Sequence, residues 1–285
     1  MNQELYRSAT RSRRQKTGSI IPAYLSAFPD VYDKGEKDMI AKTEQDIEGL
    51  KKIGKVVAII RDELKEMTKP GMRTIDLDLH AAKLFEQYGA LSGPKVTYDF
   101  PGFTCISVNE EVAHGIPGDR IIQEGDLVNV DVSASLDGYF ADTGVSFVVG
   151  NGDPKLTQLC EASILAFEAG AQKIRAGSKR SNAGKATYNT AKKLGFTIIT
   201  NLTGHGIGKS LHDDPEYILS YYDPTDNGLW KEGMVIAYEP FVSTKAEEVA
   251  EGNDGWTLKT DDGSFVAQYE HTMIITKGEP IILTK

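Results

Sequence analysis

Four acidic side chains lie in or directly after short apolar runs of this sequence, where charged residues are rare. Asp131 and Glu239 each follow such a run, and Asp142 and Glu270 each lie eight residues before a glycine. A buried acid needs a partner, because removing an unpaired charge from water is unfavourable. Several carboxylates grouped together are typical of a site for divalent cations.

The spacing of Asp131 and Asp142 predicts that they approach each other across a β-hairpin. The two acids are eleven residues apart and flank the turn signal Leu136-Asp137-Gly138. A two-residue turn at 136–137 would place them directly opposite each other, whereas a turn at 137–138 would make them diagonal neighbours. In the alternative interpretation, Asp142 is a solvated strand residue and Asp131 caps a turn. Facing carboxylates repel each other, and a bound cation removes that repulsion.

Three of the five histidines are candidates for the same site. His205 lies in the segment TGHGIG (203–208), whose small residues leave room for a metal ion, so a ligand role is favoured over a core role. His114 is followed by glycine, as His205 is, and His212 lies seven residues after His205. His114 and His212 are therefore candidates for polarising or protonating a substrate.

The other two histidines are interpreted as structural. His271 directly follows Glu270, so on a strand it points to the opposite face, where packing or a supporting hydrogen bond is expected. His80 lies among Leu79, Ala81 and Ala82 in a predicted helix.

Two other motifs are rejected as catalytic sites. The glycine-rich segment before Lys209 and Ser210 is similar to a phosphate-binding loop, but Thr203 stands where that motif requires its first glycine. Cys105 could act as a nucleophile. Beside so complete a set of metal ligands, a small apolar residue of a pocket is the favoured interpretation.

The four carboxylates and one or two imidazoles form an oxygen-rich set of ligands without thiolates. Such a set suits a pair of divalent ions of Mn, Fe, Co or Zn. Two ions held about 3.5–4 Å apart by bridging carboxylates lower the pKa of a water molecule between them. The residues therefore predict a metallohydrolase.

The elements that must position these side chains can be predicted from periodicity. Apolar residues recur every three or four positions from about Glu36 to Met67, and again from Thr74, which can cap a helix, to Gly89. Runs of β-branched residues flank the Asp-Gly turn and predict the hairpin. The second half of the chain repeats the pattern. The predicted hairpin strands are 127–132 and 145–149, the later helices 155–176 and 182–195, and the later strand 196–200.

The two halves also correspond in sequence. Residues 124–131 align with residues 232–239, since both segments begin with Glu-Gly and end in an acid. Asp142 corresponds to Glu270, and each half carries a His-Gly-Ile motif. One such pair could arise by chance, but three pairs in the same order argue against it. Two similar halves related by an approximate two-fold axis would bring the acids around one centre.

Composition narrows the class of protein. The chain has 285 residues and a formal net charge of −9, which argues against a nucleic-acid-binding surface. Two cysteines exclude a disulfide framework and favour a reducing, cytoplasmic setting. No apolar run approaches the roughly 18 residues of a membrane span. Residues 1–40 predict a flexible or surface-packed extension, with a targeting segment or polyanion-binding arm less favoured, and residues 41–285 a single domain.

From about Asp46 to the C-terminus, the chain resembles the methionine aminopeptidases. The resemblance rests on the settings of five ligands, namely Asn129-Val-Asp131, Asp142-Thr-Gly144, Gly204-His-Gly-Ile-Gly208, Glu239-Pro240 and Ala267-Gln-Tyr-Glu270-His-Thr272. It implies an α+β, pita-bread fold, in which an antiparallel sheet with pseudo-two-fold halves is flanked by helices. It also implies a single metallo-aminopeptidase domain with two divalent metal ions.

The resemblance assigns a role to each ligand. Asp131 would chelate the first ion, and Asp142 and Glu270 would bridge the two ions. His205 and Glu239 would bind the second ion.

The resemblance also assigns catalytic and substrate-binding residues. His114, His212 and Glu239 match catalytic residues, with Glu239 in the position proposed as proton shuttle. His114 and His212 also match substrate-contacting histidines. Three further residues fall where the family lines its methionine pocket, namely Phe100, Cys105 and Trp256. Leu211 occupies a position where some members carry an aromatic residue.

The implied activity is removal of the initiator methionine from nascent proteins and peptides by a metal-activated bridging hydroxide. Only 26 residues separate His212 from Glu239, which leaves no room for the long insertion of the type II enzymes and implies type I. The expected partners are the N-terminal methionine of nascent chains and the ribosome, with no specific nucleic acid and no membrane. We expect a cytoplasmic monomer.

Two alternatives remain open. Xaa-Pro dipeptidases and aminopeptidases share this fold and a similar set of ligands, but generally carry a large N-terminal domain that about 40 residues cannot form. A non-catalytic peptide- or ribosome-binding protein of the same fold is the other alternative, and the intact set of five ligands argues against it.

Overall fold

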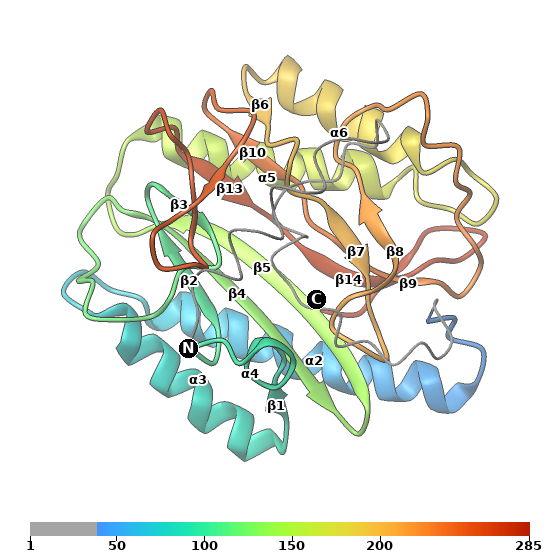
Figure 1. Ribbon diagram of the computed structural model, residues 1–285, viewed down its shortest axis with the longest axis horizontal. Helices are drawn as coiled ribbons and strands as arrows, with labels where there is room; N and C mark the ends of the chain where they lie inside the picture. Colours follow the sequence, from blue (N-terminus) through green and yellow to red (C-terminus); the bar gives the residue numbers. More distant parts are fainter. Residues whose placement is uncertain (1–38) are drawn as a thin grey trace, which may run out of the picture. The chain divides into compact units, whose positions relative to one another are not determined.

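The structure, a computed structural model, describes residues 39–285 (Figure 1). The extension predicted for residues 1–40 lies outside the described residues except for Met39 and Ile40. Met39 is buried, and Ile40 forms an antiparallel β-bridge with Met234. Within residues 39–285, no helix is long and apolar enough to cross a membrane.

Helix α2 (Glu44–Met67) begins later than the apolar pattern predicts, because a capping box determines its start. The Thr43 hydroxyl accepts the Asp46 amide N–H at 3.1 Å, and the Asp46 carboxylate accepts the Thr43 amide N–H at 3.1 Å. The predicted apolar stripe faces inward. Its buried residues include Leu50, Ile53, Val57, Ile60 and Leu64.

Helix α3 (Thr74–Tyr88) ends as predicted at Gly89, whose φ of 66° is left-handed. The prediction that Thr74 caps this helix is wrong, because Arg73 holds the cap position. The Thr74 hydroxyl instead accepts the Gly118 N–H at 2.9 Å and donates to the Gly118 carbonyl at 3.1 Å. These bonds fasten the loop that precedes β4 to the helix.

The predicted hairpin consists of β4 (Leu127–Leu136) and β5 (Tyr139–Val148), which pair along their whole length. The turn residues Asp137 and Gly138 have φ values of 54° and 81°. Positive φ at both central residues is what a type I′ turn requires. Strand β4 also pairs with two shorter strands, β1 (Leu91–Ser92) and β2 (Cys105–Val108). A short helix, α4 (Gly93–Tyr98), lies between these two strands in the sequence.

The second half of the chain builds similar elements. Helices α5 (Pro154–Ala171) and α6 (Ser181–Lys193) precede two sheets with strand orders β15-β14-β9-β7-β8 and β13-β10-β6. A third small sheet, β11-β12-β3, joins the two halves. The bounds are β3 (Glu111–Ala113), β6 (Thr197–Ile198), β7 (Gly204–Gly206), β8 (Asp213–Ile218), β9 (Val235–Tyr238), β10 (Phe241–Ser243), β11 (Ala250–Glu251), β12 (Leu258–Lys259), β13 (Val266–Gln268), β14 (His271–Ile274) and β15 (Ile281–Ile282).

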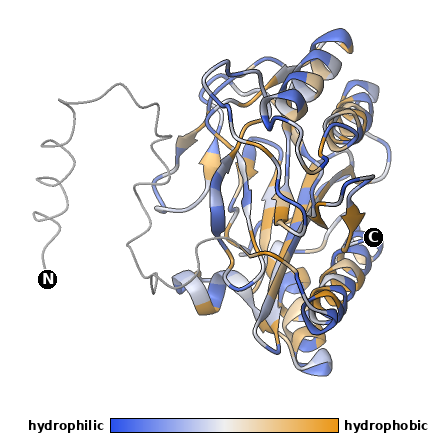
Figure 2. Ribbon diagram, turned by 90° about the vertical axis from the view of Figure 1, so that its right-hand side faces the viewer, coloured by the Kyte–Doolittle hydropathy of each residue, from blue (hydrophilic) through white to orange (hydrophobic). Residues whose placement is uncertain are grey.

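Both helix pairs lie on the same side of the sheets (Figures 1 and 2). Apolar side chains of α2 and α3 pack on β4 in one core, and those of α5 pack on strands of the second half in two further cores. A pair of helices and an antiparallel sheet are thus repeated, as the sequence correspondence predicts. Among residues 39–285, no long helix covers the opposite face of the sheets. The acidic side chains meet in the interior between the halves.

Candidate metal centre

Asp131 and Asp142 are diagonal neighbours on the central hairpin. Asp131 pairs with Gly144, and Asp142 pairs with Ser133. Of the two registers that the sequence left open, the one given by an Asp-Gly turn is observed, and the two acids are not directly opposite. Their carboxyl groups nevertheless lie close enough for each to affect the pKa of the other.

Three elements bring further ligands to this hairpin. Ligand atoms of Asp142, His205 and Glu270 all lie within 4.8 Å of one another, and all three side chains are buried. The Glu270 amide N–H donates to the Gly144 carbonyl at 2.9 Å, which joins the second half of the chain to β5. Glu239, directly after β9, places Oε1 3.5 Å from His205 Nε2. The five residues predicted as ligands are thus grouped by the fold.

The chemistry of this group fits divalent cations. Burial raises the pKa of Asp131 to about 6. Burial, followed by the negative charge of neighbouring carboxylates, raises the pKa values of Asp142, Glu239 and Glu270 well above the usual range. Asp142 Oδ1 is buried and has no hydrogen-bond partner within the described part of the chain. A cation would relieve both the desolvation of these carboxylates and their mutual repulsion.

His205 is oriented for ligation through Nε2. Its Nδ1 lies 2.8 Å from the Gly206 carbonyl, which can only accept, so Nδ1 carries the proton and Nε2 presents its lone pair. Burial lowers the pKa of His205 to about 4, which keeps the ring neutral near pH 7. A neutral imidazole oriented in this way is the form that binds a metal ion.

Gln268 and Asn129 belong to the site, although the sequence analysis gave them no role. Gln268 Nε2 lies 3.4 Å from Asp131 Oδ2, 3.2 Å from Glu239 Oε2 and 3.1 Å from Glu270 Oε2. The Asn129 amide donates to Gln268 Oε1 at 2.9 Å. Strand alternation could have revealed both residues, since Asn129 lies two positions before Asp131 and Gln268 two before Glu270.

The two histidines predicted to contact substrate lie beside His205. The ring centroids of His205 and His212 are 4.1 Å apart, and His212 Nδ1 is hydrogen-bonded to the Tyr98 hydroxyl. Burial lowers the pKa of His114 to about 4 and that of His212 well below its usual value. His114 has a φ of 54°, a strained conformation for a non-glycine residue that is often found at functional sites.

Of the three residues predicted to line a pocket, the two aromatic ones contact each other and Cys105 lies beside an acid. Phe100 and Trp256 form an edge-to-face pair with ring centroids 5.1 Å apart. Cys105 on β2 is opposite Asp131 on β4. Burial, with nearby carboxylates, raises the pKa of the Cys105 thiol well above its usual value, which argues against a nucleophile. Leu211 is buried in the apolar core of the first half.

The remaining histidines make structural contacts. His271 is buried, with Nδ1 2.8 Å from the Thr284 hydroxyl and Nε2 3.0 Å from the Tyr269 hydroxyl. His80 Nε2 lies 2.7 Å from Glu63 Oε1, across the α2–α3 pair. Within the described residues, the hydrogen bonds of these two histidines go to partners other than the four carboxylates of the site, so both occupy the structural positions that their sequence contexts indicate.

Comparison with known proteins gives a consistent result. Residues 48–277 match the model of metallopeptidase family M24. The chain is 55% identical over 248 residues to methionine aminopeptidase 2 of Bacillus subtilis, covering 87% of this chain and 100% of that protein. It is 39% identical to a methionine aminopeptidase of Aquifex aeolicus, covering 85% of this chain and 97% of that one.

Solved structures share the fold. The crystal structure of methionine aminopeptidase from Thermotoga maritima superposes with a TM-score of 0.82 at 36% identity, covering 87% of this chain and 100% of that one. A prolidase from Pyrococcus furiosus gives a TM-score of 0.69 at 23% identity, covering 87% of this chain and 66% of that one. The pita-bread fold expected from the sequence is thereby confirmed. The chain belongs to metallopeptidase family M24, and within it is similar to the methionine aminopeptidases.

Proposed function

We propose that the protein removes the N-terminal methionine from proteins and peptides by metal-dependent hydrolysis. The observation that carries this proposal is the grouping of four buried carboxylates and one neutral imidazole. The similarity to methionine aminopeptidases over nearly the whole described chain supports the same activity.

The proposed cofactor is a pair of divalent ions of Co, Mn, Fe or Zn. Asp131, Asp142, Glu239, Glu270 and His205 would hold them. When bound, the ions would supply Lewis-acid activation of water and of the substrate carbonyl.

The chain itself would supply proton handling and orientation. His212, neutral because of its burial and fixed by Tyr98, can donate a hydrogen bond from Nε2 to a developing oxyanion. Glu239, whose pKa is raised by burial, can take up a proton at a carboxylate oxygen and release it to the leaving amine. His114 is the second substrate contact.

The pocket would select methionine by its apolar walls. Phe100, Cys105 and Trp256 offer two aromatic faces and a thiol, surfaces on which a flexible thioether packs well. Water would be excluded from the buried parts of this pocket, which strengthens the hydrogen bonds made beside it.

Cleavage of Xaa-Pro dipeptides is the alternative activity. The prolidase similarity is at 23% identity and supports the fold alone. Metal-reconstituted protein should therefore be tested on Met-Ala-Ser and on an Xaa-Pro dipeptide. Release of methionine from Met-Ala-Ser is expected, and preferential cleavage of the Xaa-Pro dipeptide would reverse the assignment.

The cellular setting is part of the proposal. We infer a cytoplasmic monomer that meets its substrates as they leave the ribosome. Although the chain as a whole is negatively charged, residues 169–212, which include α6, contain lysines and arginines but no aspartate or glutamate, and this local positive charge would favour contact with the RNA of the ribosome. Cosedimentation with ribosomes at rising salt, beside light scattering of the free protein, tests both parts.

A further inference from the structure

His114 and Trp256 lie at the same end of one strand pair. Strand β3 pairs antiparallel with β12, so that Leu258 is opposite Ala113. His114 directly follows Ala113, and Trp256 lies two residues before Leu258. Because the strands are antiparallel, both residues leave the ladder at the same end. The position of this pair therefore determines the spacing between two walls of the proposed substrate site.

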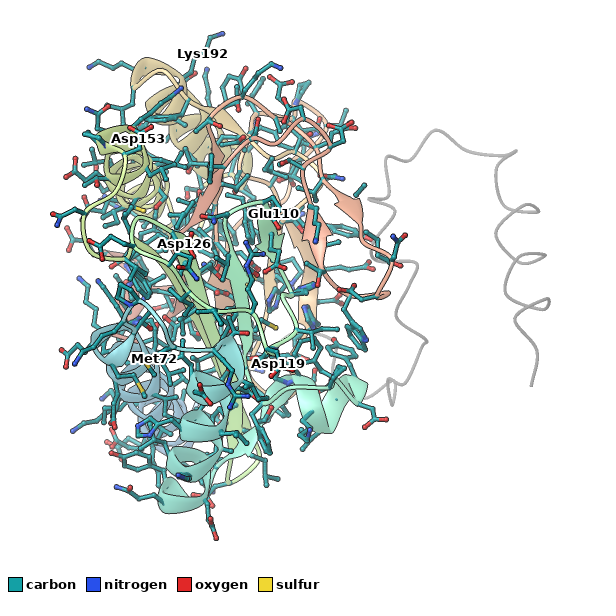
Figure 3. All side chains as sticks on the ribbon, turned by 90° about the vertical axis from the view of Figure 1, so that its left-hand side faces the viewer. Met72, Glu110, Asp119, Asp126, Asp153 and Lys192 are labelled. Atoms are coloured by element: carbon teal, nitrogen blue, oxygen red, sulfur yellow. The ribbon has the colours of Figure 1, made fainter. Side chains whose placement is uncertain are left out.

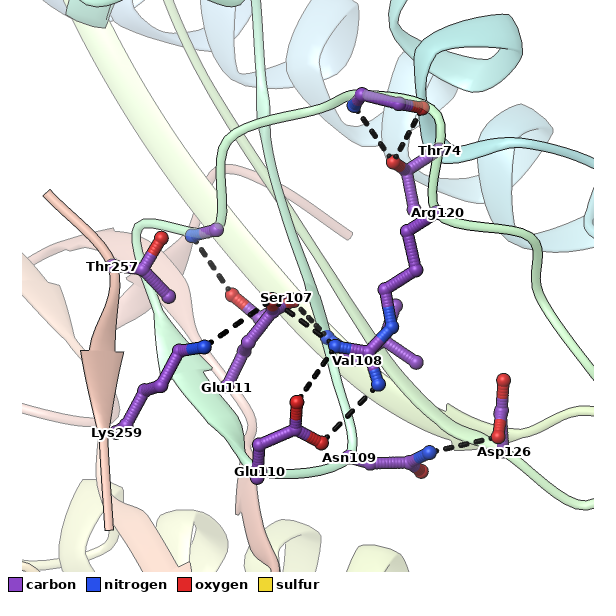
Figure 4. Close-up of polar contacts among 12 residues, drawn as sticks. Thr74, Ser107, Val108, Asn109, Glu110, Glu111, Arg120, Asp126, Thr257 and Lys259 are labelled. Carbon is purple, nitrogen blue, oxygen red and sulfur yellow. Dashed lines mark hydrogen bonds and ion pairs between the residues drawn. The ribbon is translucent and has the colours of Figure 1, made fainter. Parts of the chain in front are cut away.

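Glu111 joins three chain segments at the other end of the pair (Figure 4). Its Oε1 lies 3.1 Å from Arg120 Nη1 and 4.0 Å from Lys259 Nζ, and its Oε2 accepts the Val108 amide N–H at 3.0 Å. The Glu111 side chain is only 17% exposed. Partial burial strengthens such charge-assisted bonds relative to exposed ion pairs.

The cation opposite Glu111 is itself fixed. The Arg120 guanidinium makes two bonds to Glu110, at 3.0 and 3.2 Å. Glu110 and Asp119 lie near the middle of the face that Figure 3 turns toward the viewer. Arg120, in the loop between β3 and β4, is thus bonded to Glu110, which lies in the turn between β2 and β3.

A change of register occurs within this pair of strands. Lys259 is opposite Glu111, although Leu258 is opposite Ala113, so Val112 is an extra residue on β3. A bulge of this kind re-aims the side chains that follow it. On β3, the following residues are Ala113 and the strained His114.

The chain after His114 has little freedom to adjust. The Gly115 amide donates to Ser107 Oγ at 3.0 Å, and a Cβ on Gly115 would lie 2.3 Å from the Ile106 carbonyl oxygen. Three residues further on, Gly118 is held by Thr74. The chain after His114 is therefore held in place, while the contacts of Glu111 hold strand β3 before it against Val108, Arg120 and Lys259.

We propose that Glu111 is a positioning residue. It acts through Arg120 and Lys259 to hold His114, and the β11–β12 hairpin that carries Trp256, at the spacing that fits a methionyl substrate. This inference rests on the proposed function. It assigns the cluster of Glu111, Arg120 and Lys259 to substrate recognition and not to the metal centre, because none of these three side chains contacts a proposed metal ligand.

The test compares steady-state kinetics, metal affinity and stability. In Glu111→Gln, which keeps the bond to the Val108 amide but loses the charge, KM for Met-Ala-Ser should rise about tenfold while kcat changes less than about threefold. The Mn²⁺ dissociation constant, measured by calorimetry, should stay within about twofold of the wild-type value, because the ligands are untouched. Lys259→Met, at a half-exposed position, should raise KM in the same direction.

Lys245→Met is the matched control. It removes a lysine with a similar ion pair, to Asp262 at 3.2 Å, outside the cluster, and should leave KM unchanged. Unchanged KM in both folded cluster variants would overturn the inference, as would a loss of Mn²⁺ affinity in proportion to the loss of activity. Failure of the wild-type protein to cleave Met-Ala-Ser would instead overturn the proposed function itself.

Discussion

The Asn129 side-chain Nδ2 donates to Gln268 Oε1 at 2.9 Å and thereby determines which way the Gln268 side-chain amide faces. With its oxygen held by Asn129, Gln268 must direct its NH₂ group toward the carboxylates. Gly144 permits this approach, because a Cβ there would lie 2.2 Å from Gln268 Oε1. The two N–H groups of Gln268 Nε2 are therefore shared among carboxylates from three segments of the chain.

Replacement of Gln268 should weaken metal binding. In Gln268→Ala the carboxylates lose the donor that orients them, and we expect Mn²⁺ affinity, measured by calorimetry, to fall about tenfold. Gln123→Ala, at an exposed position, is the control and should bind as the wild type does. Equal affinities in all three proteins would show that Gln268 does not orient the ligands.

Metal binding should depend on pH in a defined direction. The pKa of Asp131 is raised to about 6, and the pKa values of Asp142, Glu239 and Glu270 are also raised, by burial and by neighbouring carboxylates. In the metal-free protein these groups hold protons that a cation must displace. Affinity for Mn²⁺ should therefore rise as the pH rises through about 6, with proton release visible in calorimetry in buffers of different ionisation enthalpy. A pH-independent affinity would contradict the raised pKa values.

Loss of His212 should affect turnover more than metal binding. His212→Ala removes the proposed donor to the oxyanion, and kcat for Met-Ala-Ser should fall about 100-fold with Mn²⁺ affinity unchanged. Tyr98→Phe removes only the hydroxyl bonded to His212 Nδ1 and should have a smaller effect on kcat. A kcat for His212→Ala close to that of the wild type would exclude the assigned role.

Both cysteines should be unreactive in the folded protein. Burial raises the pKa of Cys160 to about 12 and that of Cys105 well above its usual value, so neither forms a thiolate near pH 8. Iodoacetamide should alkylate them only after denaturation, as mass spectrometry can show. Rapid alkylation of Cys105 with parallel loss of activity would revive the nucleophile interpretation.

Most of the fold could be predicted from sequence because strong periodicity and turn signals mark its elements. The stripe of α2, the left-handed Gly89 and the Asp-Gly turn are local features, and the internal repeat added the relation between the halves. The apolar pattern predicts a start of α2 that is too early. The pattern continues upstream of Glu44, but a capping box at Thr43 and the pairing of Ile40 with Met234 determine where the helix begins.

The register of the hairpin was harder to predict. A shift of the turn by one residue changes Asp131 and Asp142 from opposite to diagonal neighbours, and only the positive φ values of Asp137 and Gly138 decide between them. The roles of Glu111 and Arg120 could not be predicted either. The contacts of these residues join segments that are distant in the sequence, and no periodic pattern of residues marks such contacts.

The central claim is tested most directly by methionine release from Met-Ala-Ser, measured for protein reconstituted in turn with Mn, Fe, Co and Zn. The account predicts release with at least one of these metals, its loss after chelation, and a loss of at least about 100-fold in Glu239→Ala. Absence of release with every metal, or unchanged release by folded, metal-replete Glu239→Ala, would contradict it.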